Sequence, residues 1–176
     1  MKMSIYEALQ HRHSIRAYTG EPVPEEKLNM ILQAGLMSES GHNKKSYELI
    51  VVRDHEALQE MSACRVGCAK MLAAADAAIV VIGDAELSDT WIEDGAVIMA
   101  NMHLTADDLG IGSCWVQGRL RSAVNGESTE EFLRKLLGFP EKYRLEAILA
   151  LGMPAEEKPK HDPENLPAEK IHYGKF

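Results

Sequence analysis

The feature that most limits the possible folds is an uncharged helical stretch in the middle of the chain. Residues 95–106 contain no aspartate, glutamate, lysine or arginine. A surface helix has one apolar stripe, whereas this segment is apolar on most faces, so we predict a buried helix. Thr90 and Glu93 have the spacing of a capping box at its start, and Gly110 fits the position just past its end. A turn then leads into a predicted buried strand at 113–116, and a helix and strand meeting in this way form a suitable floor for a flat ligand.

The chain has 176 residues and a net charge of −8 with histidine counted as neutral. This length suits a single domain, since domains cluster near about 100–200 residues. The acidic balance gives no general attraction to nucleic acid or anionic lipid, so an anion site would need a local cluster of basic residues. No apolar run approaches the roughly 20 residues of a membrane helix, and the N-terminus lacks the apolar core of a signal peptide. We expect a cytoplasmic protein that binds neither nucleic acid nor membrane.

The cysteines do not form a recognisable framework. Cys64 and Cys68 are four residues apart, which is not the spacing of a redox pair, and no histidine lies at metal-ligand spacing from them. Together with Cys114 they are therefore expected to be reduced thiols packed in the interior.

Apolar runs predict four strands with helices between them. The strands are expected at 47–52, 77–82, 113–116 and 144–151, and the run at 77–82 is continuous, as in a strand covered on both faces. Ser4–Glu7 and Ser128–Glu131 have capping-box spacing, and the helices are predicted at 5–10, up to Gly35, after Asp54 to 62, around 68–75, over 90–109, and from 129 to Gly138. This pattern favours an α+β fold or a mixed α/β sandwich.

The C-terminal segment differs in character from the rest. Residues 153–176 contain four prolines and many charges, and show no periodicity before the Ile171-His-Tyr run. Residues 1–152 are therefore predicted to form the single domain, and the remainder an arm. Such an arm either moves freely or wraps a partner subunit, and its apolar residues at 170–173 favour wrapping.

Two local segments could bind a ligand. Arg12, Ser14 and Arg16 lie within five residues, so that two guanidiniums and a hydroxyl could embrace one phosphate. The alternative is a solvated charged turn. Residues 40–43, Ser-Gly-His-Asn, are small or amide-bearing and would let backbone approach a planar ligand. The alternative there is an ordinary turn before a strand.

Other chemistry is disfavoured. The acidic residues between Asp84 and Asp94 miss the spacing of a calcium loop and are expected to form a solvated loop with favourable charges near a helix start. His103 on the central helix is expected to be a hydrogen-bonded core imidazole, so no metal site is predicted. Ser113 does not lie in a nucleophile elbow.

Four motifs, in order along the chain, are similar to those of one family. Residues 12–18, Arg-His-Ser-Ile-Arg-Ala-Tyr, are similar to an Arg-Arg-Ser-x-Arg-x-Phe signature. Residues 40–48, Ser-Gly-His-Asn-Lys-Lys-Ser-Tyr-Glu, are similar to Ser-Gly-Arg-Asn-x-Gln-Pro-Trp-Glu. Residues 110–115, Gly-Ile-Gly-Ser-Cys-Trp, and 151–154, Leu-Gly-Met-Pro, are similar to a Gly-Leu-Gly-x-x-Trp turn and a Leu-Gly-x-Pro segment. Over nearly its whole length the chain thus resembles the FMN-dependent nitroreductase family.

The resemblance implies an α+β homodimer, in which each three-layer subunit has a central mixed sheet with helices on both faces and a swapped C-terminal arm. Two FMN molecules would bind at the subunit interface. The implied FMN-binding residues are Arg12, His13, Ser14, Arg16, Ser40, Gly41, Asn43, Trp115, Val116, Gln117, Lys158 and Lys160. Among them Arg12 and Ser14 would bind the phosphate with Lys158 or Lys160. Arg16 would lie near the pyrimidine edge of the ring, where a cation stabilises the negative charge of reduced flavin.

The remaining contacts would come from both subunits. Ser40, Gly41 and Asn43 would approach the ring from the partner, and residues 115–117 would line its other side. Lys45 and Ser46 depart from the family's Gln and Pro beside the ring, which puts substrate access and flavin potential in doubt. The chain also lacks the longer insertions of larger members, so a shallow, open pocket is expected.

The resemblance implies an NAD(P)H-dependent flavin oxidoreductase with ping-pong kinetics. NADH or NADPH would reduce the flavin, and a flat acceptor such as a nitroaromatic or quinone would then enter the same pocket. No side chain is assigned as a catalytic acid or base, because the cofactor carries the chemistry. The alternative is a flavin-binding or flavin-free homodimer that acts as a carrier, sensor or scaffold without efficient turnover.

Overall fold

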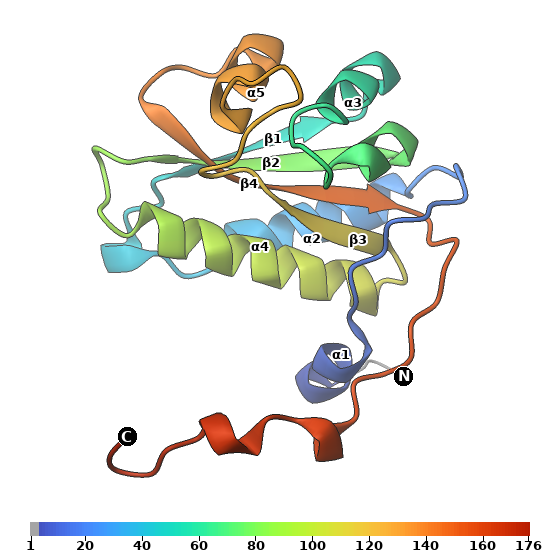
Figure 1. The fold of residues 1–176 in the computed structure, drawn as a ribbon, viewed down its shortest axis with the longest axis vertical. Helices are drawn as coiled ribbons and strands as arrows, with labels where there is room; N and C mark the ends of the chain where they lie inside the picture. The colour runs from blue at the N-terminus through green and yellow to red at the C-terminus, as the bar shows by residue number, and fades with distance from the viewer. Residues whose placement is uncertain (1–3) are drawn as a thin grey trace.

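A computed structural model describes residues 4–176, whose arrangement is shown in Figure 1. The strands are β1 (Tyr47–Val52), β2 (Ala77–Asp84), β3 (Gly112–Gln117) and β4 (Tyr143–Gly152). The α-helices are α1 (Ile5–His11), α2 (Glu25–Leu36), α3 (His55–Met61), α4 (Trp91–Asp108) and α5 (Thr129–Leu137). The 3₁₀ turns are η1 (Gly41–Asn43), η2 (Lys70–Ala74), η3 (Pro163–Asn165) and η4 (Ala168–Lys170). All four predicted strands and the main predicted helices are confirmed, with ends that shift by a few residues.

The sheet has the strand order β1-β2-β4-β3. Every strand pairing in residues 4–176 is antiparallel, so the predicted mixed sheet is wrong for this part of the chain. The reason lies in the connections. β2 and β3 run in the same direction and are joined by α4, but β4 is inserted between them and runs opposite to both.

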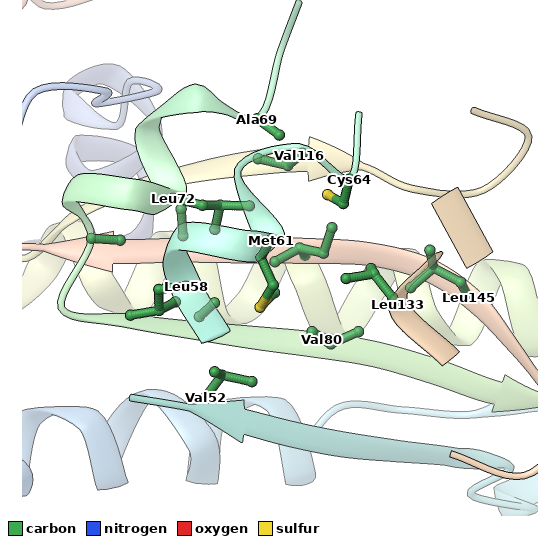
Figure 2. Packing of buried hydrophobic residues seen from close by; sticks show 14 of the residues in the cluster. Val52, Leu58, Met61, Cys64, Ala69, Leu72, Val80, Val116, Leu133 and Leu145 are labelled. Carbon is green, nitrogen blue, oxygen red and sulfur yellow. The ribbon is translucent and has the colours of Figure 1, made fainter. Parts of the chain in front are cut away.

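Helices cover both faces of the sheet, which confirms the predicted three-layer sandwich. Figure 1 shows α2 and α4 on one face and α3 and α5 on the other. A hydrophobic core lies on each face of the sheet. Figure 2 shows the core on the side of α3 and α5, where Leu58 and Met61 of α3 pack with Val80, Val116 and other buried residues. All eight residues of β2 are buried, as the continuous apolar run predicts.

The central helix α4 is buried on one side only. Met99, Met102 and other residues on that side pack against the sheet and α2. On the other side Val97 and Leu104 are half-buried and Ala100 is exposed. The prediction that most faces of this helix are buried is therefore wrong for a single chain. The sheet can cover only one side of a helix, and the second apolar side is only partly covered by residues 4–176. None of the helices in these residues has the length and apolar character of a bilayer span.

The predicted helix ends are confirmed at most positions. Ser4 forms the complete capping box, and the Ser128 hydroxyl accepts the predicted bond from the Glu131 amide. Gly110 follows α4 with a positive φ of 71°. The capping box at Thr90 is wrong, because the Thr90 hydroxyl instead shares a 3.0 Å hydrogen bond with that of Ser88.

The C-terminal arm leaves the sheet at the end of β4 and runs past α1 (Figure 1). It is tied to the segment after α1, where the Ala155 amide donates to the Ala17 carbonyl, and to α1 itself, where the His161 amide donates to the Gln10 carbonyl. From residue 157 onward every arm residue is exposed. Apart from Met153, which packs against the core on the α4 side of the sheet, the arm therefore adds little to the core of its own chain.

Candidate functional site

The segment after α1 runs beside the edge strand β3. The Ile15 amide donates to the Ser113 carbonyl at 2.9 Å, which fixes the segment against the strand. The approach is close because residue 112 is a glycine: a Cβ there would lie 2.9 Å from the Ile15 side chain and 3.2 Å from Pro154. Predicted ligand-binding residues are thereby brought to the open edge of the sheet.

Arg12 is oriented by a chain of hydrogen bonds to α4 and β3. Its Nη1 donates to His103 Nε2 at 3.0 Å, so the other ring nitrogen, Nδ1, donates to Ser113 Oγ at 2.5 Å. Burial, together with the Arg12 charge, lowers the pKa of His103 from 6.5 to about 4. The imidazole is thus neutral at physiological pH, and the prediction of a hydrogen-bonded core histidine is confirmed.

A cavity of about 600 Å³ opens beside β3. Two predicted site residues, Arg16 and Trp115, line it together. The full lining set is Arg16, Arg65, Gly67, Cys68, Lys70, Met71, Ala74, Cys114 and Trp115. Three of these residues are cationic and none is a carboxylate, so the cavity favours an anionic, partly apolar ligand.

Sequence reasoning missed two of the three cations. Arg65 and Lys70 flank Gly67, which adopts a positive φ of 74° in the turn before η2. The available signal was a pair of basic residues on either side of a glycine, a few residues before a buried strand. The same region corrects one expectation about the cysteines, because Cys68 is exposed in this turn while Cys64 and Cys114 are buried.

Glu156 joins the arm to the Arg12–Arg16 segment. Its Oε1 accepts from the Arg16 amide at 2.6 Å and the Ala17 amide at 3.2 Å, and its Oε2 pairs with Lys158 Nζ at 2.7 Å. Hydrogen bonds from Lys158 and from the Arg16 amide lower the pKa of Glu156 to about 2. Lys158 is thereby placed close to Arg16, whereas Lys160 is exposed farther along the arm.

A second cavity of about 270 Å³ lies near the C-terminal end of α4. His13 and Lys158 line it, together with Asp107 and Gly112. The His13 ring stacks on that of His161 in the arm, with centroids 4.2 Å apart. Two more predicted residues therefore meet here. In the sequence, Ser14 lies between His13, which lines this cavity, and Arg16, which lines the larger one. The Ser14 carbonyl accepts a 3.4 Å hydrogen bond from Arg16 Nη1.

The structure separates the three predicted residues on β3. Trp115 Nε1 donates to Gln117 Oε1 at 2.9 Å, so these two side chains lie together on one face. Val116 points to the other face, where it is 1% exposed within the core. Successive strand residues alternate between faces, so the Val116 side chain cannot line the ring and only its backbone is available.

The loop with Ser40, Gly41 and Asn43 lies at the opposite end of α4. The Gly41 amide donates to Asp94 Oδ1 at 2.8 Å. Asp94 and His103 are nine residues apart, which corresponds to about 14 Å along the helix axis. The loop residues line neither cavity, so the structure does not bring them together with Arg16 in one chain.

The acidic stretch is less solvated than expected. Asp84 and Asp94 are buried, and Asp84 accepts from two backbone amides and pairs with Lys142 at 3.2 Å. Among residues 4–176 no group of three or more His, Cys, Asp or Glu side chains could hold a metal ion.

Comparison with known proteins identifies the family. Residues 4–175 match a family model described as "Putative TM nitroreductase". The chain belongs to the nitroreductase family of flavin oxidoreductases. It is 36% identical over 171 residues to an Archaeoglobus fulgidus protein named "Putative NADH dehydrogenase/NAD(P)H nitroreductase", with 94% of each chain covered.

Solved structures of family members have the same fold. An FMN-dependent nitroreductase from Clostridium difficile superposes with a TM-score of 0.93 at 39% identity, covering 97% of this chain and 99% of that one. A Desulfovibrio desulfuricans protein described as "a putative nitroreductase in complex with fmn" gives a TM-score of 0.78 at 25% identity, covering 100% of this chain and 99% of that one. The predicted family and the α+β fold are confirmed.

Proposed function

We propose that this family member is an NAD(P)H-dependent flavin oxidoreductase that binds FMN beside β3 and reduces a flat acceptor, such as a nitroaromatic or a quinone, by a ping-pong mechanism. The observation that carries the proposal is the 600 Å³ cavity, with Arg16, Arg65 and Lys70 on its wall. A ring system with an anionic phosphate tail fits this combination of apolar and cationic lining. The FMN complex of the Desulfovibrio desulfuricans relative supports the same cofactor.

The chain's own residues would bind and orient the cofactor. Arg12, His13 and Ser14 would bind the phosphate together with Lys158 or Lys160, since guanidinium, ammonium and hydroxyl groups form charge-assisted bonds to phosphate oxygens. Arg16 and Lys70 would place positive charge along one ring edge, where it stabilises negative charge on a bound ring.

Trp115 and Gln117 would form a wall beside the ring, with the Val116 backbone between them. FMN, when bound, supplies the hydride chemistry. No side chain in the cavity is given the role of acid or base.

We further propose a homodimer in which the second subunit completes the site. Three observations support it: the incompletely covered apolar side of α4, the exposed arm, and the placement of Ser40, Gly41 and Asn43 away from the chain's own cavity. Leu166 and Tyr6 also line an apolar groove of about 350 Å³ between the arm and α1. In this arrangement residues 1–152 form the domain, the arm at 153–176 wraps the partner, and the loop residues of the partner subunit approach the ring.

The first experiment is the visible absorption spectrum of the purified protein, repeated anaerobically after NADH and after NADPH. A flavin spectrum that bleaches with either nucleotide is the expected result. A flavin spectrum that does not bleach would favour a binding-only protein. A colourless protein that takes up no added FMN would contradict the proposal.

Arg16→Ala tests the assigned cation directly. It is expected to weaken FMN binding by about 10- to 150-fold, because removal of one charge-assisted contact costs roughly 1.5–3 kcal/mol. Arg121→Ala is the matched control, since Arg121 is exposed and does not line the cavity. Wild-type FMN affinity in the Arg16 variant would rule out its role.

Light scattering after gel filtration tests the dimer. The expected mass is twice the 19.5 kDa of one chain. Leu166→Glu is expected to lower that mass or raise the dimer dissociation constant, because it places a charge in the apolar groove. A wild-type protein that elutes as a monomer would contradict the proposed assembly.

A further inference from the structure

A buried glutamate interrupts the pairing of β4 with β2. Val81 pairs with Ala147 and Ile82 with Leu145, so that Glu146 is the extra residue of a β-bulge. A bulge redirects the side chain that it carries, and bulges are common beside active sites. Here the redirected side chain is one that sequence analysis did not single out.

The fold leaves room for this side chain. Glu146 is 4% exposed and packs against Gly95 of α4, where a Cβ would lie only 3.1 Å from the Glu146 Cγ. Its Oε2 is buried and has no hydrogen-bond partner among residues 4–176. Burial raises the pKa of this carboxyl even though Gln117 and the charge of Arg119 act in the opposite direction. A buried polar atom without a partner costs stability, so the side chain calls for a functional explanation.

The other carboxylate oxygen of Glu146, Oε1, is connected to the cavity by hydrogen bonds through Gln117 and Trp115. Gln117 Nε2 donates to Glu146 Oε1 at 3.4 Å and to the Glu146 carbonyl at 3.2 Å. Gln117 Oε1 accepts the Trp115 indole N–H at 2.9 Å. Because an indole can only donate, Gln117 must turn its carbonyl toward Trp115 and its NH₂ toward Glu146. The direction of the whole chain is therefore determined, and its last member is part of the cavity wall.

We propose that Glu146 is a positioning residue of the flavin site, which acts through Gln117 to fix the Trp115 indole at the cavity wall. This inference rests on the proposed function, because it assigns the fixed indole to the FMN cavity. Glu146 does not touch the ligand itself. Its contribution is to remove the alternative orientations of the Gln117 amide, so that the wall is already formed when the ring enters.

The test uses the full-length protein and two variants of nearly the same size. Glu146→Gln keeps a side-chain acceptor for the Gln117 amide, whereas Glu146→Leu removes it and leaves only the backbone carbonyl of residue 146. Ile148→Val is the control for a small loss of packing, because Ile148 is buried in the same strand but lies outside the chain of hydrogen bonds.

The first readout needs no cofactor. The protein has two tryptophans, so its ¹H–¹⁵N spectrum contains two indole signals, and Trp91→Phe assigns them. In the FMN-free protein, Glu146→Leu is expected to speed solvent exchange of the Trp115 indole proton by about fivefold, the effect of one net hydrogen bond. Glu146→Gln and Ile148→Val are expected to stay close to wild type.

The second readout is FMN affinity, measured by quenching of FMN fluorescence. Glu146→Leu is expected to raise the dissociation constant about fivefold, while Glu146→Gln restores wild-type affinity. Unchanged indole exchange and affinity in Glu146→Leu would overturn the inference. So would equal weakening by Glu146→Leu and Ile148→Val.

Two further outcomes can be distinguished from each other: a Glu146→Leu variant that does not fold, and a wild-type protein that does not bind FMN. If Glu146→Leu does not fold, Glu146→Met, which is unbranched and adapts to the same space, also removes the side-chain acceptor and is expected to change the indole exchange in the same way. If it leaves the exchange unchanged, the inference fails. If the wild-type protein does not bind FMN, the proposed function fails, whereas the indole measurement still decides whether Glu146 fixes Trp115.

Discussion

The polar groups near the two ends of α4 differ in how completely they find hydrogen-bond partners within one chain. At the C-terminal end, Arg12, His103 and Ser113 form a continuous chain of hydrogen bonds, and Lys27 Nζ donates to the Leu109 carbonyl at 2.7 Å. Backbone segments from both termini of the chain also meet there. The donors and acceptors of this end therefore find their partners within the subunit.

The N-terminal end is less complete. Asp94 Oδ2 and Ser46 Oγ are buried without a hydrogen-bond partner among residues 4–176. Nearby, His42, Asn43 and Lys45 adopt positive φ values of 53°, 55° and 49°, which are unfavourable for residues other than glycine. Strained backbone and unpaired polar atoms concentrate at functional sites. We call the C-terminal end of α4, whose polar groups are hydrogen-bonded within one chain, the finished end, and the N-terminal end, with its unpaired polar atoms, the incomplete end. The incomplete end has the features of a surface shaped for a ligand or a second subunit.

The largest expected effect is a loss of folding stability at low pH, caused by His103 at the finished end. Between pH 6.5 and about 4 the unfolded chain protonates His103 while the folded chain does not, so the unfolded state binds more protons. Stability therefore falls as the pH drops through this window, by about 3 kcal/mol for the full shift. Denaturant unfolding at several pH values measures this loss.

The matched variant is His103→Gln, which cannot titrate. Its absolute stability is expected to be lower, because the geometry toward Arg12 and Ser113 changes, but its stability should depend less on pH in the same window. Equal pH slopes for the wild type and the variant would show that His103 is not the titrating group.

Gly112→Ala tests the close packing of the finished end. The new methyl group would press on Ile15, Pro154 and the Gly152 carbonyl, the last at 3.1 Å, and is expected to cost about 2 kcal/mol. Gly110→Ala is the control, because a Cβ there meets nothing within 4 Å and only its positive φ of 71° opposes the change. Thermal unfolding should rank Gly112→Ala as the more damaging variant, and the reverse order would contradict the close approach.

Gly41→Ala tests the incomplete end. A Cβ at this position would overlap the Thr90 hydroxyl, and the expected cost is about 1 kcal/mol because an exposed loop can shift. Thr90→Ala removes the hydroxyl, so the double variant should recover most of the loss. A double-mutant cycle measures this recovery, and strictly additive losses would show that the two residues do not interact.

The smallest expected effect concerns the tie between the arm and the site. Glu156→Gln weakens the acceptor of the Arg16 and Ala17 amides, so both amides should exchange with solvent faster in hydrogen-exchange experiments. The effect is local, because Glu156 is partly exposed and its ion pair with Lys158 is screened by water. Glu157→Gln is the neighbouring control, and equal exchange in the two variants would contradict the tie.

Local sequence patterns predicted the elements and much of the site. The continuous apolar run of β2 and the uncharged stretch of α4 indicated burial, and the motif at residues 12–18 indicated the segment that now lies beside β3. Such patterns are readable because helix and strand periodicities depend on neighbours a few residues away. The errors had two sources. The Thr90 hydroxyl bonds the nearby Ser88 hydroxyl instead of capping the helix, which is a local competition between two polar partners. The incompletely buried side of α4 depends on which distant segments pack against it.

By itself the sequence determined the secondary structure, the three-layer α+β architecture, the family, and the basic segment at Arg12–Arg16. Only the tertiary structure decided that Arg65 and Lys70 join Arg16 at one cavity, that Val116 faces the core, and that Glu146 is turned by a bulge toward Gln117. These features depend on strand register and on contacts between segments far apart in the sequence, such as the 3.4 Å bond between Gln117 and Glu146, which are 29 residues apart. A side chain's direction along a strand reverses with a register change of one residue, and local pattern does not specify that register.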